Sequence, residues 1–249
     1  MFRDKLFYYL ANYTLQHSFE KEIIKLLKNE KKLIIFDVGC YRGIFTKTIL
    51  KLIKKKKYKF YLFDINKNVK NYITNLLKLR NIYYNEIALS NRNGVANYNY
   101  NRFFESAGSS LSNIVRNDTR WNFSRKLILK ILLFKPKSFV KYQVPTITLD
   151  NFLKKNKIKS IEILKIDIEG SEYDLLKGAK TALKKNKIKI ILVEIVDKKN
   201  LYNKKEKKIF NLLKKRNFIL KKKANILSIS LFSNIKGGDY LFVNRKYLK

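Results

Sequence analysis

Short apolar runs alternate with amphipathic stretches along most of the chain. The runs are almost free of polar residues, as strands buried on both faces of a sheet must be. In the stretches between them, apolar residues recur every three or four positions, which is the spacing of a helix that covers one face of a sheet. The pattern predicts an α/β fold with a mostly parallel sheet and helices on both faces. The clearest strands are 33–36, 60–63, 163–166 and 190–193.

The last fifth of the chain predicts one more helix and a final pair of strands. The helix is expected around 205–216, and the strands at 218–220 and 240–243. Gly237 and Gly238 are interpreted as the turn that separates the strands, because consecutive glycines commonly mark turns. We expect this pair to lie at an edge of the sheet.

The alternation fails between residues 101 and 142, where Ser, Asn and Gly are frequent. We therefore divide the chain into an N-terminal helical segment over 1–30 and a domain over 31–249, with an insertion or lid at about 102–142. Within the insertion, 120–134 is both basic and apolar. Such a helix can pack as a lid on the domain or lie on an anionic membrane surface, and both interpretations stay open.

The composition excludes several classes of protein. With 249 residues, 46% of them hydrophobic and 14% aromatic, the chain can bury a full core, so it is not a disordered basic tail. The single Cys40 cannot form an intrachain disulfide, and with the single His17 it cannot build a structural zinc site. The apolar runs are far shorter than the ~18 residues that span a bilayer. We predict a cytoplasmic protein, with peripheral membrane contact as an alternative.

The chain is strongly basic, with 56 Lys and Arg against 19 Asp and Glu and a formal charge of +37. Its lysine runs fall at the C-terminal ends of predicted helices, where cations complement the helix dipole. In an open α/β sheet those ends lie opposite the crevice that binds ligands. A compositional preference for lysine explains this distribution, and a nucleic-acid-binding face is the alternative. The runs are 54–57, 154–155, 184–185 and 214–215.

Acidic residues are few, and several of them directly follow or end a predicted strand. In a parallel sheet these positions meet at the edge where ligands bind. Carboxylates there can accept hydrogen bonds from hydroxyl or ammonium groups, act as bases or bind a metal. For the acids around Gly170 and Ser171, capping of a following helix is the alternative role. The acids are Asp37, Asp64, Asp167 with Glu169, Glu194 and, at an edge, Asp239.

A glycine loop follows the first predicted strand and opens a helix. Gly39 and Gly43 are separated by three residues, and Tyr41 occupies the position of the second glycine of a G-x-G-x-x-G pyrophosphate loop. The loop therefore favours a ligand with an amino-acid moiety and no phosphate. Asp64, at the end of the next strand, could accept hydrogen bonds from ribose hydroxyls. S-adenosylmethionine has both of these features.

The sequence resembles an FkbM-type methyltransferase, a class I enzyme that depends on S-adenosylmethionine. The most specific shared segment is Asp-x-Glu-Gly-x-Glu at 167–172 with the downstream Gly178-Ala179. The chain departs from the family's usual Gly-Ala-Asn-x-Gly loop at residues 40–42 and has Asp64-Ile65 where Glu-Pro is usual. The other shared segments are 37–43, 87–90 with Gly94, 108–110, 148–150 and 193–195.

The resemblance implies a Rossmann-like fold, a seven-stranded sheet with an antiparallel edge strand, and methyl transfer to a hydroxyl of a glycan or related small molecule. Asp167 is the first candidate for the base and Glu169 the second. Asp167 with Glu194 could hold Mg²⁺, which prefers oxygen ligands. The cofactor-binding candidates are Asp37, Gly39, Cys40, Tyr41, Gly43, Asp64 and Ala88, and the substrate-binding candidates are Ser109, Ser110, Glu172 and Glu194.

Two other functions stay open. The positive charge and the position of Lys165 near Asp167 would suit an RNA 2′-O-methyltransferase. The segment from Trp121 to Phe134 would suit a non-catalytic module that binds a membrane surface. Methylation of an adenine amino group is disfavoured, because neither Pro136 nor Pro145 forms part of the Asn/Asp-Pro-Pro-aromatic segment that this chemistry uses.

Overall fold

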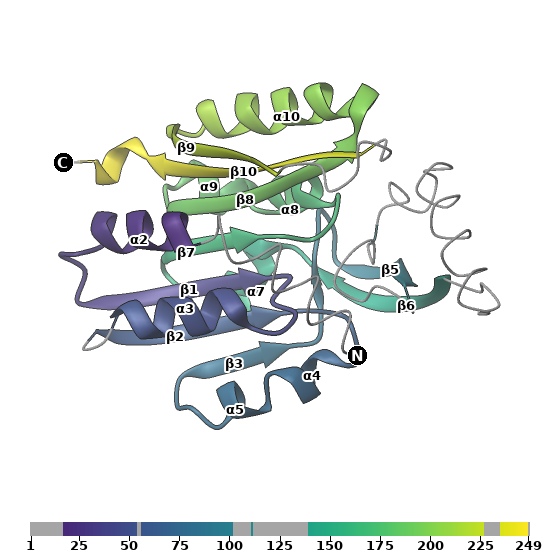
Figure 1. Ribbon diagram of the computed structural model, residues 1–249, viewed down its shortest axis with the longest axis horizontal. Coiled ribbons are helices and arrows are strands. Elements are labelled where there is room, and N and C mark those ends of the chain that lie inside the picture. Colours follow the sequence, from purple (N-terminus) through teal and green to yellow (C-terminus); the bar gives the residue numbers. More distant parts are fainter. Residues whose placement is uncertain (1–16, 54–55, 102–110, 112–138, 227–234, 249) are drawn as a thin grey trace.

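The computed structural model describes residues 17–53, 56–101, 111, 139–226 and 235–248 (Figure 1). A seven-stranded sheet runs through the molecule in the order β3-β2-β1-β7-β8-β10-β9. The first five strands in this order are parallel, and β10 runs antiparallel to both of its neighbours. The strands are β1 Lys32–Val38, β2 Lys57–Phe63, β3 Ile82–Asn85, β7 Ile161–Ile166, β8 Ile188–Lys198, β9 Phe218–Ile226 and β10 Ile235–Asn244.

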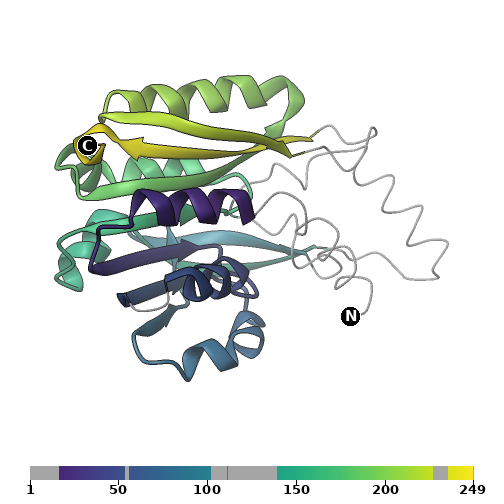
Figure 2. The same ribbon diagram turned by 60° about the vertical axis from the view of Figure 1, so that its left-hand side comes forward.

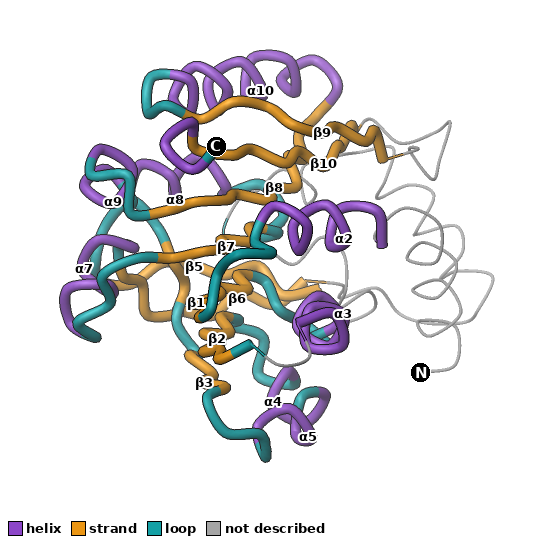
Figure 3. Tube along the Cα trace, turned by 90° about the vertical axis from the view of Figure 1, so that its left-hand side faces the viewer, coloured by secondary structure: helices purple, strands orange, loops and turns teal. Residues whose placement is uncertain are grey.

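Helices cover both faces of this sheet, as the sequence pattern predicts (Figure 3). One face carries α2 (His17–Leu26), α3 (Ile44–Ile53), α4 (Val69–Tyr72) and α5 (Thr74–Leu77). The opposite face carries α7 (Leu149–Lys155), α8 (Glu172–Gly178), α9 (Lys180–Lys184) and α10 (Lys199–Lys214). Figure 2 shows α10 running along β9 and β10. The seven-stranded α/β fold predicted from the sequence is therefore confirmed.

The central strand β1 shows how the sequence determines the two layers of the core. Leu33 and Ile35 pack against the α2 and α3 face, whereas Phe36 and Val38 pack against the α7 and α8 face. Side chains alternate between the faces of a strand, so a strand that is buried on both sides needs apolar residues at nearly every position. Asp37 interrupts the run and has 0% exposure.

A smaller sheet extends the domain beyond the main sheet (Figure 1). Its strands are β4 (Ala88–Leu89), β6 (Phe139–Ile147) and β5 (Gly94–Asn101), in that spatial order. Strand β6 pairs antiparallel with β5 over residues 139–146, so residues 139–142 of the expected insertion belong to a strand. A 3-10 helix, η1, follows β10 at Arg245–Tyr247.

The prediction of a turn at Gly237 and Gly238 is wrong. Both glycines lie inside β10, where they pair with Val196 and Ile195 of β8. A Cβ atom at Gly238 would lie 2.9 Å from the Tyr202 hydroxyl, so the small residue makes room for side-chain packing and not for a turn. The expected helix at 205–216 also begins earlier, since α10 starts at Lys199.

Candidate active site

The glycine loop after β1 is held against the end of β7. Gly39 has a φ angle of +76°, and a Cβ atom there would lie 1.7 Å from the backbone carbonyl oxygen of Asp167. Gly43 has a φ angle of +66° and packs against Leu76 of α5 in the same way. Both positions require glycine, because an added side chain would clash and because residues other than glycine rarely adopt a positive φ angle. The loop and Asp167 are therefore direct neighbours.

Asp37 and Cys40 lie beneath this loop and not at its surface. The hydroxyl of Thr46 donates a hydrogen bond of 2.7 Å to Oδ2 of Asp37. Cys40 is 4% exposed, and burial raises the pKa of its thiol well above the usual range. Cys40 thus acts as a small packing residue, whereas Asp37 supports the loop from the interior.

Lys165 connects the glycine loop to Asp167. Its ammonium group lies 2.9 Å from Oδ2 of Asp167 and 3.4 Å from Oδ1 of Asp37, and it donates a hydrogen bond of 2.9 Å to the carbonyl of Gly39. Burial alone would lower the pKa of Lys165, but Asp167 and Asp37 raise it above its ordinary value. A lysine inside an apolar strand thus neutralises two carboxylates and holds the loop to β7.

Asp64 follows β2 and holds the other side of the glycine loop. Its Oδ2 atom accepts a hydrogen bond of 2.9 Å from the backbone amide of Tyr41, and its Oδ1 atom accepts one of 3.0 Å from the amide of Asn66. Burial raises the pKa of this carboxyl, although both hydrogen bonds act in the opposite direction. Each oxygen keeps capacity for a further donor such as a ribose hydroxyl.

The side chains that replace the family's usual loop residues pack on one another. The guanidinium of Arg42 lies 5.3 Å from the ring centre of Tyr41 and 5.0 Å from that of Tyr72. The two tyrosine rings are 5.6 Å apart in an edge-to-face arrangement. Tyr41 has a φ angle of +42°, a conformation that is uncommon for residues other than glycine. Tyr72 therefore stabilises a loop in which Tyr41 is a strained residue.

Asp167 is hydrogen-bonded to Glu194 of the adjacent strand β8. Burial would raise the pKa of Asp167, but Lys165 and a hydrogen bond from Glu194 lower it below its usual range. Burial and the neighbouring Asp167 raise the pKa of Glu194 well above its usual range. Of the two carboxyls, Asp167 is therefore the one that favours the ionised form, and Glu194 is the one that favours the protonated form.

Two further carboxyl groups lie near this pair: Asp239, which the sequence placed among the acids at a sheet edge, and Glu20, which it did not indicate. Asp239 stands opposite Glu194 in the pairing of β10 with β8, and burial with Asp167 raises its pKa to about 7. Glu20 of α2 is 3% exposed, and burial raises its pKa to about 7. An acidic residue on the apolar face of α2, next to Phe19, is the signal that could have indicated Glu20.

Glu169 and Glu172 belong to the turn that joins β7 to α8. Glu169 has a φ angle of +51°, and Gly170 follows with +111°. Glu172 is completely buried, accepts a 2.5 Å hydrogen bond from the amide of Gly170 and pairs with Lys205 of α10 at 2.6 Å. The structure thus places Glu172, a predicted substrate ligand, in the interior, where its carboxylate braces the turn.

The remaining predicted residues are not brought to this edge. Ala88 is buried in β4, where it pairs with Thr146 of the smaller sheet. Ser109, Ser110 and the basic segment 120–134 lie outside the described residues, so their predicted roles stay predictions. None of the described helices is long and apolar enough to cross a membrane.

The residues proposed to bind Mg²⁺ do not fit such a site. Asp167 is engaged by Lys165, and burial with the neighbouring Asp167 raises the pKa of Glu194, whereas Mg²⁺ binds ionised or carbonyl oxygens in octahedral geometry. Across the described ranges, no group of three or more His, Cys, Asp or Glu side chains is arranged to hold a metal ion.

The sequence matches the profile of the Methyltransferase FkbM domain over residues 37–220, which is most of the chain. The chain belongs to the FkbM methyltransferase family. Matched residues of this FkbM domain include Asp64, Asp167 and Glu194, whereas Glu20 and Asp239 lie outside the matched range. No curated protein sequence matches the chain significantly.

One solved structure agrees with this assignment at the level of the fold. A crystal structure of methyltransferase FkbM from Methylobacillus flagellatus KT aligns with a TM-score of 0.50 and 11% identity, over 84% of this chain and 44% of that one. This FkbM chain thus spans less than half the length of that relative. N-methyltransferase NodS from Bradyrhizobium japonicum WM9 aligns at a TM-score of 0.46 and 6% identity, covering 94% and 98% of the two chains.

Proposed function

We propose that this FkbM protein transfers a methyl group from S-adenosylmethionine to a hydroxyl of a glycan or related small molecule. The observation that carries the proposal is the contact between the glycine loop and Asp167, which Lys165 holds from below. A loop suited to an amino-acid ligand, an acid suited to ribose and an ionised carboxylate thus meet at one edge of the sheet. This is the arrangement that a bound methyl donor and its acceptor need.

The residues divide the work of the reaction. Asp64 accepts hydrogen bonds from the ribose hydroxyls, and the loop around Gly39 lies beside the amino-acid portion of the cofactor. When bound, S-adenosylmethionine supplies an electrophilic methyl group, so that a carbon–oxygen bond forms as the carbon–sulfur bond breaks. Asp167 orients the acceptor hydroxyl and accepts its proton, which contributes to the rate as general base catalysis.

The charge of this edge supports a neutral, hydroxyl-rich acceptor. Asp167, Glu194 and Asp239 lie close enough to shift one another's pKa. Ionised and protonated carboxyl groups both form hydrogen bonds with sugar hydroxyls, whereas the ionised ones repel the phosphates of RNA.

RNA is the second candidate acceptor, because the chain has a formal charge of +37. The second argument for RNA, the position of Lys165 near Asp167, is weaker in the folded protein. Lys165, which would contact RNA beside Asp167, is engaged internally by Asp37, Asp167 and Gly39. Peripheral membrane contact through 120–134 would be compatible with either acceptor.

The test is methyl transfer from tritium-labelled S-adenosylmethionine to two probes, a mixture of neutral oligosaccharides and bulk transfer RNA. We expect label in the oligosaccharides, and we expect Asp167→Asn to reduce the rate by roughly 10²- to 10⁴-fold. Asp174→Asn is the matched control, since Asp174 is 46% exposed and pairs with Lys177. Label in RNA alone would favour the second candidate, and full activity of Asp167→Asn would remove that residue from the mechanism.

A further inference from the structure

Two tyrosines from different sheets hold the backbone that carries Asp64. The hydroxyl of Tyr84, on β3, donates a hydrogen bond of 3.0 Å to the carbonyl of Asp64. The hydroxyl of Tyr142, on β6, donates one of 3.2 Å to the carbonyl of Ile65. Two consecutive carbonyls after β2 are therefore held by side chains, one from the main sheet and one from the smaller sheet.

The smaller sheet reaches the same loop through further contacts. Asn68 donates a hydrogen bond of 3.1 Å to the hydroxyl of Tyr100 on β5. The ring of Tyr142 packs edge-to-face on that of Tyr98 at 5.2 Å, and the ammonium of Lys67 lies 5.1 Å from the centre of the Tyr142 ring. Tyr142 is thus fixed by its own sheet and in turn fixes the loop from 64 to 68.

The carboxylate of Asp64 is held from its other side as well. The amides of Tyr41 and Asn66 donate to its two oxygens, so the side chain is tied to the glycine loop while the backbone is tied to the tyrosines. Burial raises the pKa of Tyr142 to about 12, with Asp64 as the next cause, which places the hydroxyl and the carboxyl in one electrostatic environment. At neutral pH the hydroxyl keeps its proton and remains a hydrogen-bond donor.

We propose that Tyr84 and Tyr142 are positioning residues for the ribose of S-adenosylmethionine, acting through the backbone of Asp64 and Ile65. The inference rests on the proposed function, and it adds that the smaller sheet determines where the ribose-binding carboxylate lies. A carboxylate displaced by a fraction of an ångström loses hydrogen bonds to both ribose hydroxyls, since these bonds depend steeply on distance and angle.

The test compares two ligands in calorimetric titrations, S-adenosylhomocysteine and its 2′,3′-dideoxy analogue, which lacks the hydroxyls that Asp64 would bind. The variants are Tyr142→Phe, Tyr84→Phe and the double variant. Tyr83→Phe is the matched control, because Tyr83 neighbours Tyr84 but is 43% exposed and stacks on Tyr61. We expect the double variant to bind S-adenosylhomocysteine about tenfold more weakly and the dideoxy analogue with nearly unchanged affinity.

If the tyrosines had only a structural role, the variants would lower the affinity for both ligands equally. Equal weakening, or no weakening in Tyr142→Phe and the double variant, would overturn the inference and leave the proposed function intact. If the wild-type protein fails to bind S-adenosylhomocysteine, the proposed function fails and the inference fails with it. The single variant Tyr142→Phe keeps the test decisive if the double variant does not fold.

Discussion

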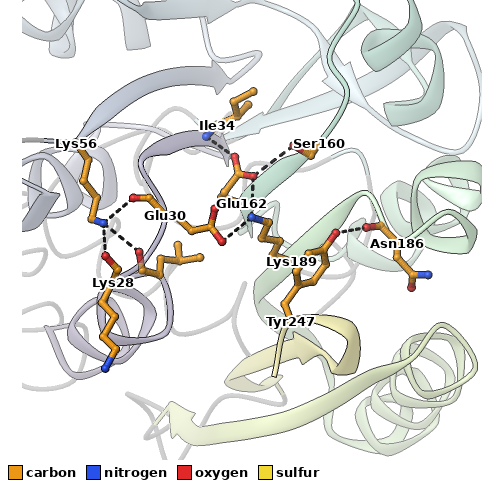
Figure 4. Close-up of polar contacts among 10 residues, drawn as sticks. Lys28, Glu30, Ile34, Lys56, Ser160, Glu162, Asn186, Lys189 and Tyr247 are labelled. Atoms are coloured by element: carbon orange, nitrogen blue, oxygen red, sulfur yellow. Dashed lines mark hydrogen bonds and ion pairs between the residues drawn. The ribbon is translucent and has the colours of Figure 1, made fainter. Parts of the chain in front are cut away.

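The two edges of the main sheet differ in how their charged side chains are paired. At the edge formed by the amino ends of the parallel strands, opposite charges are matched (Figure 4). Lys189 lies 2.8 Å from Glu30 and 3.4 Å from Glu162, and Glu162 also accepts a 2.7 Å hydrogen bond from the amide of Ile34. This edge joins the end of α2 to β1, β7 and β8, and its charges stabilise the fold.

At the edge formed by the carboxyl ends, Asp37 and Asp167 share the ammonium group of Lys165, and Glu194 and Asp239 lie close to Asp167. The pKa of Glu194 and Asp239 is raised, because burial and neighbouring carboxylates disfavour their charged forms. A chain of charge +37 has ample lysine with which to neutralise these acids, yet it leaves them in excess. An excess of buried carboxyl groups is typical of a functional site, because burial and neighbouring charges adjust protonation there for chemistry.

The largest expected effect is a difference in stability between variants of Lys165 and Lys189, one lysine from each edge. Lys165→Met leaves Asp37 and Asp167 buried without their cation, and we expect it to lower the free energy of unfolding by about 3–5 kcal/mol. Lys189→Met should cost only about 1–2 kcal/mol, since Glu162 keeps the amide of Ile34. Urea unfolding of both variants checks the difference, and equal losses would contradict the contrast between the edges.

The second prediction concerns Glu20 and pH. The pKa of this carboxyl is raised in the folded protein from 4.5 to about 7, so the folded state binds a proton that the unfolded state releases. The stabilisation that this bound proton gives to the folded state is therefore fully present below pH 4.5 and is lost as the pH rises through about 7. Glu20→Gln should stabilise the protein by about 3 kcal/mol at pH 8 and have little effect at pH 4.5.

The matched variant for Glu20→Gln is Glu162→Gln, at the opposite edge. This change removes a carboxylate that pairs with Lys189, so it should destabilise the protein at pH 8. Thermal unfolding at both pH values compares the two. If both variants stabilise the protein at pH 8, or both destabilise it, the carboxyl groups of the two edges do not differ in their effect on stability.

The smallest expected effect lies at the amino-end edge. Lys56 donates hydrogen bonds to the carbonyls of Leu27, Lys28 and Glu30, beyond the C-terminal end of α2. Because these carbonyls can be hydrated when the lysine is removed, Lys56→Met should cost about 1 kcal/mol. Lys57→Met is the neighbouring exposed control. If Lys56→Met lowers the free energy of unfolding as much as Lys165→Met does, the expected order of the two effects is wrong.

Much of the fold could be predicted because the parallel strands are buried on both faces. Continuous apolar runs at β1, β2, β7 and β8 leave few alternatives, and the acids that follow them then identify the functional edge. The turn expected at Gly237 could not be corrected from sequence, since glycine is needed at Gly238 for contact with Tyr202, which lies far away in the chain.

The candidate site was predictable only in part. Asp64 and Asp167 directly follow strands, and Glu194 follows the apolar run 190–193, so these positions are visible in the sequence, although β8 continues past Glu194 to Lys198. Glu20 was missed, because it joins them through packing of α2, and the position of the predicted Asp239 opposite Glu194 depends on the antiparallel pairing of β10; both are contacts between distant segments. The smaller sheet was also missed, because the Asn-rich alternation in β5 suggests a loop until β6 pairs with it.

The central claim is that the carboxyl-end edge binds S-adenosylmethionine. Calorimetric titration of the purified protein with S-adenosylhomocysteine tests it most directly, with NAD as the control ligand and Asp64→Ala as the control variant. We predict micromolar binding of S-adenosylhomocysteine, no binding of NAD, and at least about tenfold weaker binding in Asp64→Ala. Absence of binding to the wild-type protein, or equal affinity in Asp64→Ala, would contradict the account.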